Sequence, residues 1–188
     1  HLCDRRQRQM CIRDSFYIED NGHKYLFWGS FRGIYAIELS EDGLSLKSGS
    51  SPVQIAGTAY EGTYIHKRGG YYYMFASIGS CCEGLKSTYT TVVGRSTSLF
   101  GPYLDKKGQS MMDNHHEILI HKNDSFVGTG HNSEIVSDNA GTDWLFYHAV
   151  SVANPDGRVL MLDKIDWIDG WPSVEGNSPS VKSEKPRF

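Results

Sequence analysis

An all-β fold is the class that this sequence predicts, and three observations indicate it. Aromatic residues are frequent, with 11 Tyr, 8 Phe and 4 Trp in 188 residues, and 20 Gly and 6 Pro interrupt them. Aromatic strands separated by glycine-rich turns are typical of β-proteins. Segments of similar pattern recur along the chain, and no long stretch carries the 3.6-residue period of a helix.

Composition narrows the protein class. Apolar residues make up 39% of the chain and charged residues 22%, which is typical of one globular domain rather than a disordered chain. The net charge of −3 gives no sign of a polyanionic partner, so no nucleic acid partner is expected. No run of 18 apolar residues occurs, so no membrane partner is expected, and no signal peptide is visible.

Residues 1–14, HLCDRRQRQMCIRD, are rich in Arg and show no strand pattern. We interpret them as a leader that is either an artefact of cloning or assembly or a disordered basic tail. The alternating pattern of a folded β-protein begins at Ser15.

Three segments then share one pattern: IEDNGHKYLFWGSF from Ile18, IHKRGGYYYMFASI from Ile65 and IVSDNAGTDWLFYHA from Ile135. Each has an aliphatic start, a polar turn that contains Gly, and an aromatic run, which predicts a β-hairpin. A further strand-like stretch follows each hairpin: GIYAIELS, STYTTVVGRS and RVLMLDKIDWI.

Units of two to four short strands at such intervals predict the blades of a β-propeller, with a β-sandwich as the alternative. Tyr25, Tyr73 and Trp144 occupy equivalent places in the three units. About three blades are present, and because a propeller needs at least about four, we expect a further portion before Ser15. Residues 15–174 are thus predicted to be a partial propeller domain. The polar residues 175–188 are either a ring-closing strand or a tail.

Glu61 is the first candidate for chemistry. It stands between Tyr60 and Tyr64 in AYEGTYIHKRGG, immediately before a predicted strand. A carboxyl group in a partly apolar setting can have a raised pKa and act as a general acid, although such a Glu is more often a solvated turn residue.

Other candidates are a vicinal cysteine pair and a histidine. Cys81 and Cys82 in GSCCEG can form a strained disulfide or line a turn, and a buried structural role is favoured. The four cysteines of the chain match no zinc or redox spacing. His131 in GTGHNS can point into a cavity and bind a metal ion or ligand.

The stretch NHHEILIH superficially looks like a zinc-protease helix, but its histidines, His116 and His121, are five residues apart. The zinc motif needs two histidines four residues apart on one helix face. EILIH instead predicts a strand, and a metalloprotease is excluded.

Taken together, AYEGTYIHKRGGYYYMFASIGSCCEG, STYTTVVGRSTSLFGPYLDKKG, FWGSFRGIYAIEL, GTGHNSEIV, DWLFYHA and DKIDWIDGWPSV closely resemble family-43 glycoside hydrolases of the arabinanase kind. The resemblance runs from about Ser15 to Val174, in the family's order. It implies a five-bladed β-propeller that hydrolyses α-1,5-linked arabinan or arabino-oligosaccharides with inversion, using a base Asp, a general acid and a pKa-tuning Asp. It also implies a parent protein that is secreted or periplasmic.

Several positions match family residues. The resemblance implies that Glu61 is the general acid and that His131 faces a metal ion, commonly read as calcium and held largely through water. Ser30 and Phe31 in FWGSF match substrate-cleft residues. Cys81 and Cys82 match a vicinal pair near the acid.

The departures concern the other carboxylates. The base Asp belongs to a first blade that this chain does not contain. The tuning Asp belongs to an Ile-Asp-Pro-type motif, and Asp14 lies one residue out of register with it. We therefore expect the isolated chain to be unstable or aggregating, and inactive. The alternatives are a non-catalytic carbohydrate-binding propeller, an α-arabinofuranosidase or β-xylosidase of the same family, or a scaffold for protein partners, for which the WD signature is lacking.

Overall fold

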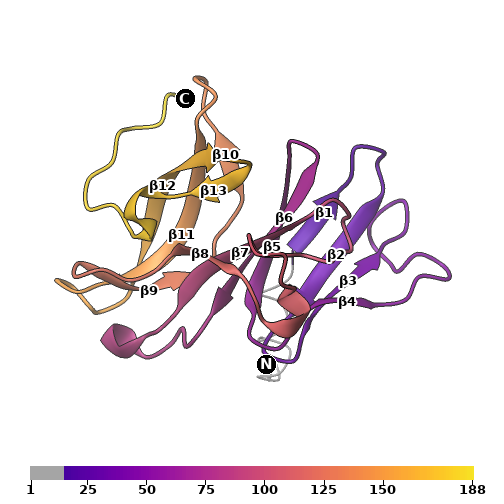
Figure 1. Cartoon of the computed structure of the whole chain (residues 1–188), viewed down its shortest axis with the longest axis horizontal. Coiled ribbons are helices and arrows are strands. Elements are labelled where there is room, and N and C mark those ends of the chain that lie inside the picture. The colour runs from indigo at the N-terminus through magenta and orange to yellow at the C-terminus, as the bar shows by residue number, and fades with distance from the viewer. Residues whose placement is uncertain (1–14) are drawn as a thin grey trace. The chain divides into compact units, whose positions relative to one another are not determined.

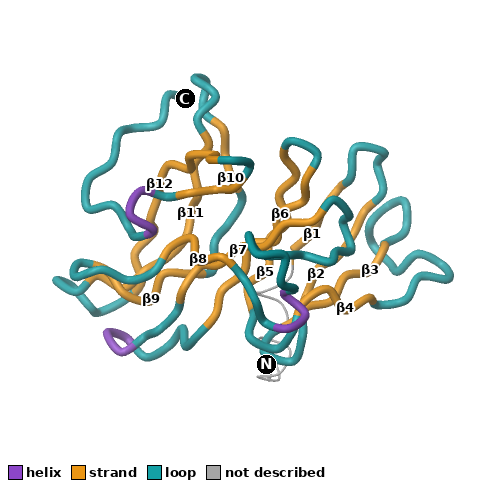
Figure 2. Tube along the Cα trace, viewed as in Figure 1, coloured by secondary structure: helices purple, strands orange, loops and turns teal. Residues whose placement is uncertain are grey.

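A computed structural model of the chain describes residues 15–188, which form two compact units. The first unit comprises residues 15–74 and Gly94–His116, and the second comprises Phe75–Val93 and Glu117–Phe188. Within residues 15–188, strands are grouped into three sheets and the only helices are three short 3-10 turns (Figures 1 and 2). The all-β prediction is confirmed. No helix in this part of the chain has the length and apolar character to cross a membrane.

The first sheet has the strand order β1-β2-β3-β4, with antiparallel neighbours. Its strands are β1 (Ser15–Ile18), β2 (Lys24–Gly29), β3 (Ile34–Glu38) and β4 (Val53–Ala56). The second sheet has the order β5-β6-β7-β8, with β5 (Glu61–Arg68), β6 (Tyr71–Ile78), β7 (Thr90–Ser96) and β8 (Glu117–Ile120). β8 is the EILI stretch, so its prediction as a strand is confirmed.

The third sheet has the order β10-β11-β12-β13, and β9 also pairs with β11. Its strands are β9 (Phe126–Gly130), β10 (Ile135–Ser137), β11 (Asp143–Ser151), β12 (Arg158–Ile168) and β13 (Trp171–Ser173). β10 pairs with one end of β11 and β9 with the other, so β9 and β10 act as one strand interrupted at residues 131–134. The 3-10 turns are η1 (Gly84–Lys86), η2 (Met111–Asp113) and η3 (Glu175–Asn177).

The three predicted hairpins are β1-β2, β5-β6 and β10-β11. Only Gly69 and Gly70 separate β5 from β6, and both have positive φ, 57° and 80°. A tight hairpin turn of this kind needs that conformation, which glycine adopts without strain. The equivalent residues Tyr25, Tyr73 and Trp144 are all buried. The repeated pattern therefore reports a repeated structural unit.

Each unit has its own buried apolar residues. Phe27, Tyr60 and Tyr103 are fully buried in the first unit, and Phe75 and Leu145 are fully buried in the second. Burial of a large apolar side chain contributes about 1.5–3 kcal/mol. These residues therefore fix the strands that carry the candidate site.

The polar C-terminal segment contains η3 and no strand. The Ser180 amide donates to the buried carboxylate of Asp163 at 3.2 Å. The Arg187 amide donates to the buried carboxylate of Asp138 at 3.1 Å, and the Asn139 amide donates to the Arg187 carbonyl at 2.9 Å. The segment is therefore bonded to the second unit through its backbone.

Candidate active site

Glu61 opens β5 and is only 1% exposed. It forms an isolated β-bridge with Ser30, whose hydroxyl donates to Glu61 Oε2 at 3.0 Å. The adjacent Phe31 amide donates to the Tyr60 carbonyl at 2.9 Å. The structure thus brings together Glu61, Ser30 and Phe31, three residues that the sequence analysis singled out.

The turn between β2 and β3 gives Ser30 and Phe31 their placement. Phe31 has φ of 47°, a left-handed conformation that few residues other than glycine adopt. A Cβ on Gly29 would lie 2.1 Å from the Gly33 carbonyl oxygen, so only glycine allows this turn to close. The ring of Phe31 is 45% exposed. An exposed aromatic residue next in sequence to Ser30, which bonds to the buried Glu61, is suited to stacking on a sugar.

The segment before Glu61 is held by residues near η2. The Gly57 amide donates to the Met111 carbonyl at 2.9 Å, and the Ala59 amide donates to Asn114 Oδ1 at 3.0 Å. The Tyr60 hydroxyl donates to the His115 carbonyl at 3.1 Å, and burial raises the pKa of Tyr60.

This support was not predicted from the sequence. The contacts that support Glu61 join segments far apart in the sequence. The only residues whose type could have indicated these contacts are Gly57 and Asn114. Asn114 adopts a left-handed φ of 66°.

His131 occupies the interruption between β9 and β10, with φ of 50°. Its backbone amide donates to the Ser77 hydroxyl at 2.8 Å. At the neighbouring Gly130, a Cβ would lie 2.2 Å from the ring of Tyr89. The backbone at this break is therefore tightly determined.

The His131 ring is stacked on the His148 ring, with centroids 6.2 Å apart and an interplanar angle of 19°. His148 in turn is stacked on Tyr89 at 5.7 Å and 15°. Burial, followed by the positive charge of Arg158 and by His131, lowers the pKa of His148 to about 4. His148 is therefore neutral at pH 7.

Cys81 and Cys82 lie in the loop after β6, Cys81 half-buried and Cys82 exposed. The expectation that the pair is buried is therefore wrong, because this loop stays at the surface. Arg158 contacts the pair: its Nη2 donates to the Cys81 carbonyl at 3.4 Å and to Cys82 Sγ at 3.2 Å. The second unit thus groups the vicinal pair with the histidines, while Glu61, Ser30 and Phe31 lie in the first unit.

Comparison with known proteins identifies the family. Residues 3–172 match the model for glycosyl hydrolases family 43. The chain belongs to this family.

Curated relatives of this family 43 chain include two extracellular enzymes. It is 35% identical to an extracellular exo-α-(1→5)-L-arabinofuranosidase, ArbA, of Cellvibrio japonicus, over 87% of this chain and 51% of the relative. It is 38% identical to an extracellular endo-α-(1→5)-L-arabinanase of Bacillus subtilis, over 83% of this chain and 48% of the relative. The chain therefore spans about half the length of the curated relatives it matches.

Solved structures of two arabinanases superpose on this chain. The α-L-arabinanase of Cellvibrio cellulosa superposes with a TM-score of 0.81 at 33% identity, over 86% of this chain and 56% of that chain. A family 43 endo-arabinanase of Bacillus licheniformis gives a TM-score of 0.78 at 34% identity, over 88% of this chain and 57% of that chain. The prediction of a partial propeller with about three blades is confirmed, and each sheet described above is a blade.

Asp14, which lies one residue out of register with the expected tuning Asp, is outside the described residues. Among residues 15–188, no group of three or more His, Cys, Asp and Glu side chains could hold a metal ion. The residue that follows His131 offers one side-chain oxygen, Asn132 Oδ1, which is buried and has no hydrogen-bond partner among the described residues. Calcium takes six to eight oxygen ligands, so the described residues do not fit a protein-built calcium site.

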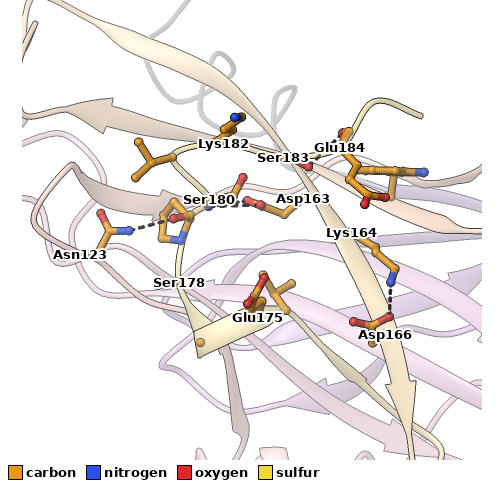
Figure 3. A pocket seen from close by; sticks show the side chains of 15 residues that line it. Asn123, Asp163, Lys164, Asp166, Glu175, Ser178, Ser180, Lys182, Ser183 and Glu184 are labelled. Carbon is orange, nitrogen blue, oxygen red and sulfur yellow. Dashed lines mark hydrogen bonds and ion pairs between the residues drawn. The ribbon is translucent and has the colours of Figure 1, made fainter. Parts of the chain in front are cut away.

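A cleft of about 720 Å³ lies in the second unit, between β12 and the C-terminal segment (Figure 3). It contains none of the candidate site residues. Two of its carboxylates already have partners, because Asp163 accepts from the Tyr147 hydroxyl and the Ser180 amide, and Asp166 pairs with Lys164 at 2.8 Å. The cleft therefore belongs to the attachment of the C-terminal segment.

Proposed function

We propose that the protein carrying this chain hydrolyses α-1,5-linked arabinan and arabino-oligosaccharides. The observation that carries the proposal is the buried Glu61, hydrogen-bonded to Ser30 in a chain of family 43. Two relatives bear the names of enzymes acting on α-(1→5)-L-arabinofuranosyl bonds, and one related arabinanase was solved with arabinohexaose. Because both relatives are named extracellular, we include secretion of the parent protein in the proposal.

In this proposal Glu61 is the general acid that protonates the leaving glycosidic oxygen. The hydroxyl of Ser30 holds the Glu61 carboxyl in a fixed orientation, and the Phe31 ring stacks on the sugar. A base Asp elsewhere in the parent activates water on the opposite face of the sugar, with inversion at the anomeric carbon. Inverting enzymes keep the two carboxyl groups about 6.5–9.5 Å apart to leave room for that water. We therefore expect the 188-residue chain by itself to be inactive.

We also propose that the parent protein binds a metal ion. We expect it beside His131, held largely through water, because the described residues provide no protein-built shell. Dialysis against a chelator followed by addition of calcium tests this expectation. A thermal midpoint that falls on chelation and recovers with calcium supports the ion, and an unchanged midpoint counts against it.

A family 43 exo-acting α-arabinofuranosidase is the second candidate, since the ArbA relative carries an exo-arabinofuranosidase name. Product analysis separates the two activities, because endo action on linear arabinan releases oligosaccharides and exo action releases short products from chain ends. Arabinose release from side chains, or cleavage of xylosides only, would instead favour the other family 43 activities.

The test compares the full-length protein with its Glu61→Gln variant on linear arabinan. General acid–base catalysis contributes about 10²–10⁴-fold, so the variant should lose about that much in kcat. NMR of the first product anomer reports inversion or retention. If the protein binds arabino-oligosaccharides but Glu61→Gln leaves kcat unchanged, Glu61 is not the acid. Binding without any hydrolysis would establish the non-catalytic carbohydrate-binding alternative.

A further inference from the structure

Arg158, the first residue of β12, contacts two separate parts of the second unit. Its Nη2 donates to the Cys81 carbonyl at 3.4 Å and to Cys82 Sγ at 3.2 Å. Its Nη1 lies 3.5 Å from Nε2 of His148 on the adjacent strand β11. The guanidinium group thus lies between the vicinal-cysteine loop and the histidine stack.

The chemistry of Arg158 decides the direction of these contacts. A guanidinium group carries five N–H donors and no acceptor, so every group facing it must accept. A carbonyl oxygen and a thiol sulfur can do so. The His148 ring can accept at Nε2 only if its single proton is on Nδ1. A proton on Nε2 would instead point one N–H donor at the N–H donor of Arg158.

The environment of His148 agrees with this tautomer. Its Nδ1 is buried and has no hydrogen-bond partner among residues 15–188, so among these residues the contact that distinguishes the two nitrogens is the one from Arg158 at Nε2. The ring lies between Tyr89 and His131, so its rotation determines the surface on which His131 stacks.

We propose that Arg158 is a positioning residue, which links the vicinal-cysteine loop to His148, holds His148 as the Nδ1–H tautomer, and so fixes the ring against which His131 packs. This proposal rests on the proposed function only for its kinetic test. The tautomer of His148 is independent of which sugar is cleaved.

The experiment uses the full-length protein with ¹⁵N-labelled histidine at pH 7.5, with a reductant that keeps Cys81 and Cys82 as thiols. Long-range ¹H–¹⁵N spectra distinguish a protonated ring nitrogen from an unprotonated one. The signals of His148 and His131 are identified by their loss in His148→Gln and His131→Gln. The expected wild-type pattern of His148 is a protonated Nδ1 and an unprotonated Nε2.

Arg158→Met keeps a long side chain but removes every donor. It should move His148 toward the Nε2–H tautomer and shift the His131 signals. Because Arg158 is exposed, the variant should remain folded, and circular dichroism checks this. The matched control is Lys164→Met, which removes one positive charge from the same strand, where Lys164 pairs with Asp166 at 2.8 Å. The control should leave both histidines unchanged.

In kinetic assays Arg158→Met should lower kcat/KM on arabino-oligosaccharides about threefold to tenfold, the scale of one ordinary hydrogen bond. The proposal is overturned if wild-type His148 is the Nε2–H tautomer, or if Arg158→Met leaves the His148 and His131 signals unchanged. Failure of the arabinanase assignment would appear as absent hydrolysis in the wild type, and the NMR result would still stand.

Discussion

Ser30 and Glu61 face each other across an isolated β-bridge, and the Ser30 hydroxyl donates to Glu61 Oε2 at 3.0 Å. The bond joins the turn after β2 to the first residue of β5. Because Glu61 is buried, the orientation of its carboxyl group depends on such fixed partners.

Ser30→Ala in the full-length protein should therefore reduce catalysis without unfolding the protein. A hydrogen bond to a charged or ionisable group contributes about 1.5–3 kcal/mol, so we expect a fall of about tenfold or more in kcat/KM on arabino-oligosaccharides. Ser45→Ala, in an exposed turn, is the control and should leave kcat/KM unchanged. Equal rates for the two variants would mean that Ser30 does not support Glu61.

Gly57→Ala should destabilise the segment that leads into Glu61. The added Cβ would lie 2.4 Å from Asn114 Oδ1 and 2.5 Å from the Met112 carbonyl oxygen, so backbone must move. Overpacking of this kind costs about 1–3 kcal/mol, measurable by urea denaturation. Gly157→Ala has no atom within 4 Å of its Cβ and serves as the control. A stability loss shared by both variants would contradict the steric explanation.

Asp138 should make the protein sensitive to acid. Burial alone would raise the pKa of Asp138, but its hydrogen bonds outweigh burial and lower the pKa to about 2. The donors are the backbone amides of Thr142, Arg187 and Ala140 and the indole of Trp144. A carboxylate with a depressed pKa stabilises the fold fully above its unfolded pKa, and that stability is lost as pH falls toward the folded value.

We therefore expect Asp138 to contribute its full stabilisation above about pH 4 and to lose it progressively between about pH 4 and pH 2. Asp138→Asn should be less stable than wild type at pH 6, and its urea midpoint should decline less between pH 4 and pH 2. Asp156→Asn, at an exposed position, is the control. Parallel pH profiles for wild type and Asp138→Asn would refute this role.

Tyr147→Phe should destabilise the third sheet. The Tyr147 hydroxyl donates to the buried carboxylate of Asp163, and burial together with Asp163 raises the pKa of Tyr147. Removing a donor from a buried polar partner costs about 1–3 kcal/mol. The thermal midpoint should fall for Tyr147→Phe and hardly change for Tyr35→Phe, whose hydroxyl makes an exposed contact. A fall of equal size in both would argue against a specific bond to Asp163.

The hairpins could be predicted from sequence because each is local. Polar turns, glycines and aromatic runs lie within a few residues of one another, and burial of Tyr25, Tyr73 and Trp144 follows from the same pattern. Glu61 could also be predicted as a candidate from the sequence, since its neighbours Tyr60 and Tyr64 indicate a partly apolar setting.

The contacts that surround the candidate site could not be predicted from the sequence in this way. Asn114 supports the segment before Glu61 from a distant part of the sequence, and Arg158 meets His148 only because β11 and β12 pair. No periodicity encodes such contacts. The expected burial of Cys81 and Cys82 failed because the general preference of free Cys for the interior does not determine whether one particular loop is covered.

The bonds of Ser180 and Arg187 to two buried carboxylates have a practical consequence for anyone who edits the gene. The polar composition of residues 175–188 resembles that of a linker, so this segment could be chosen for truncation or for the attachment of a fusion partner. A stop codon after Ser178 would remove amide donors from two buried carboxylates at once, Asp163 in β12 and Asp138 just after β10. Deletions and fusion junctions should therefore leave Ser180 and Arg187 in place.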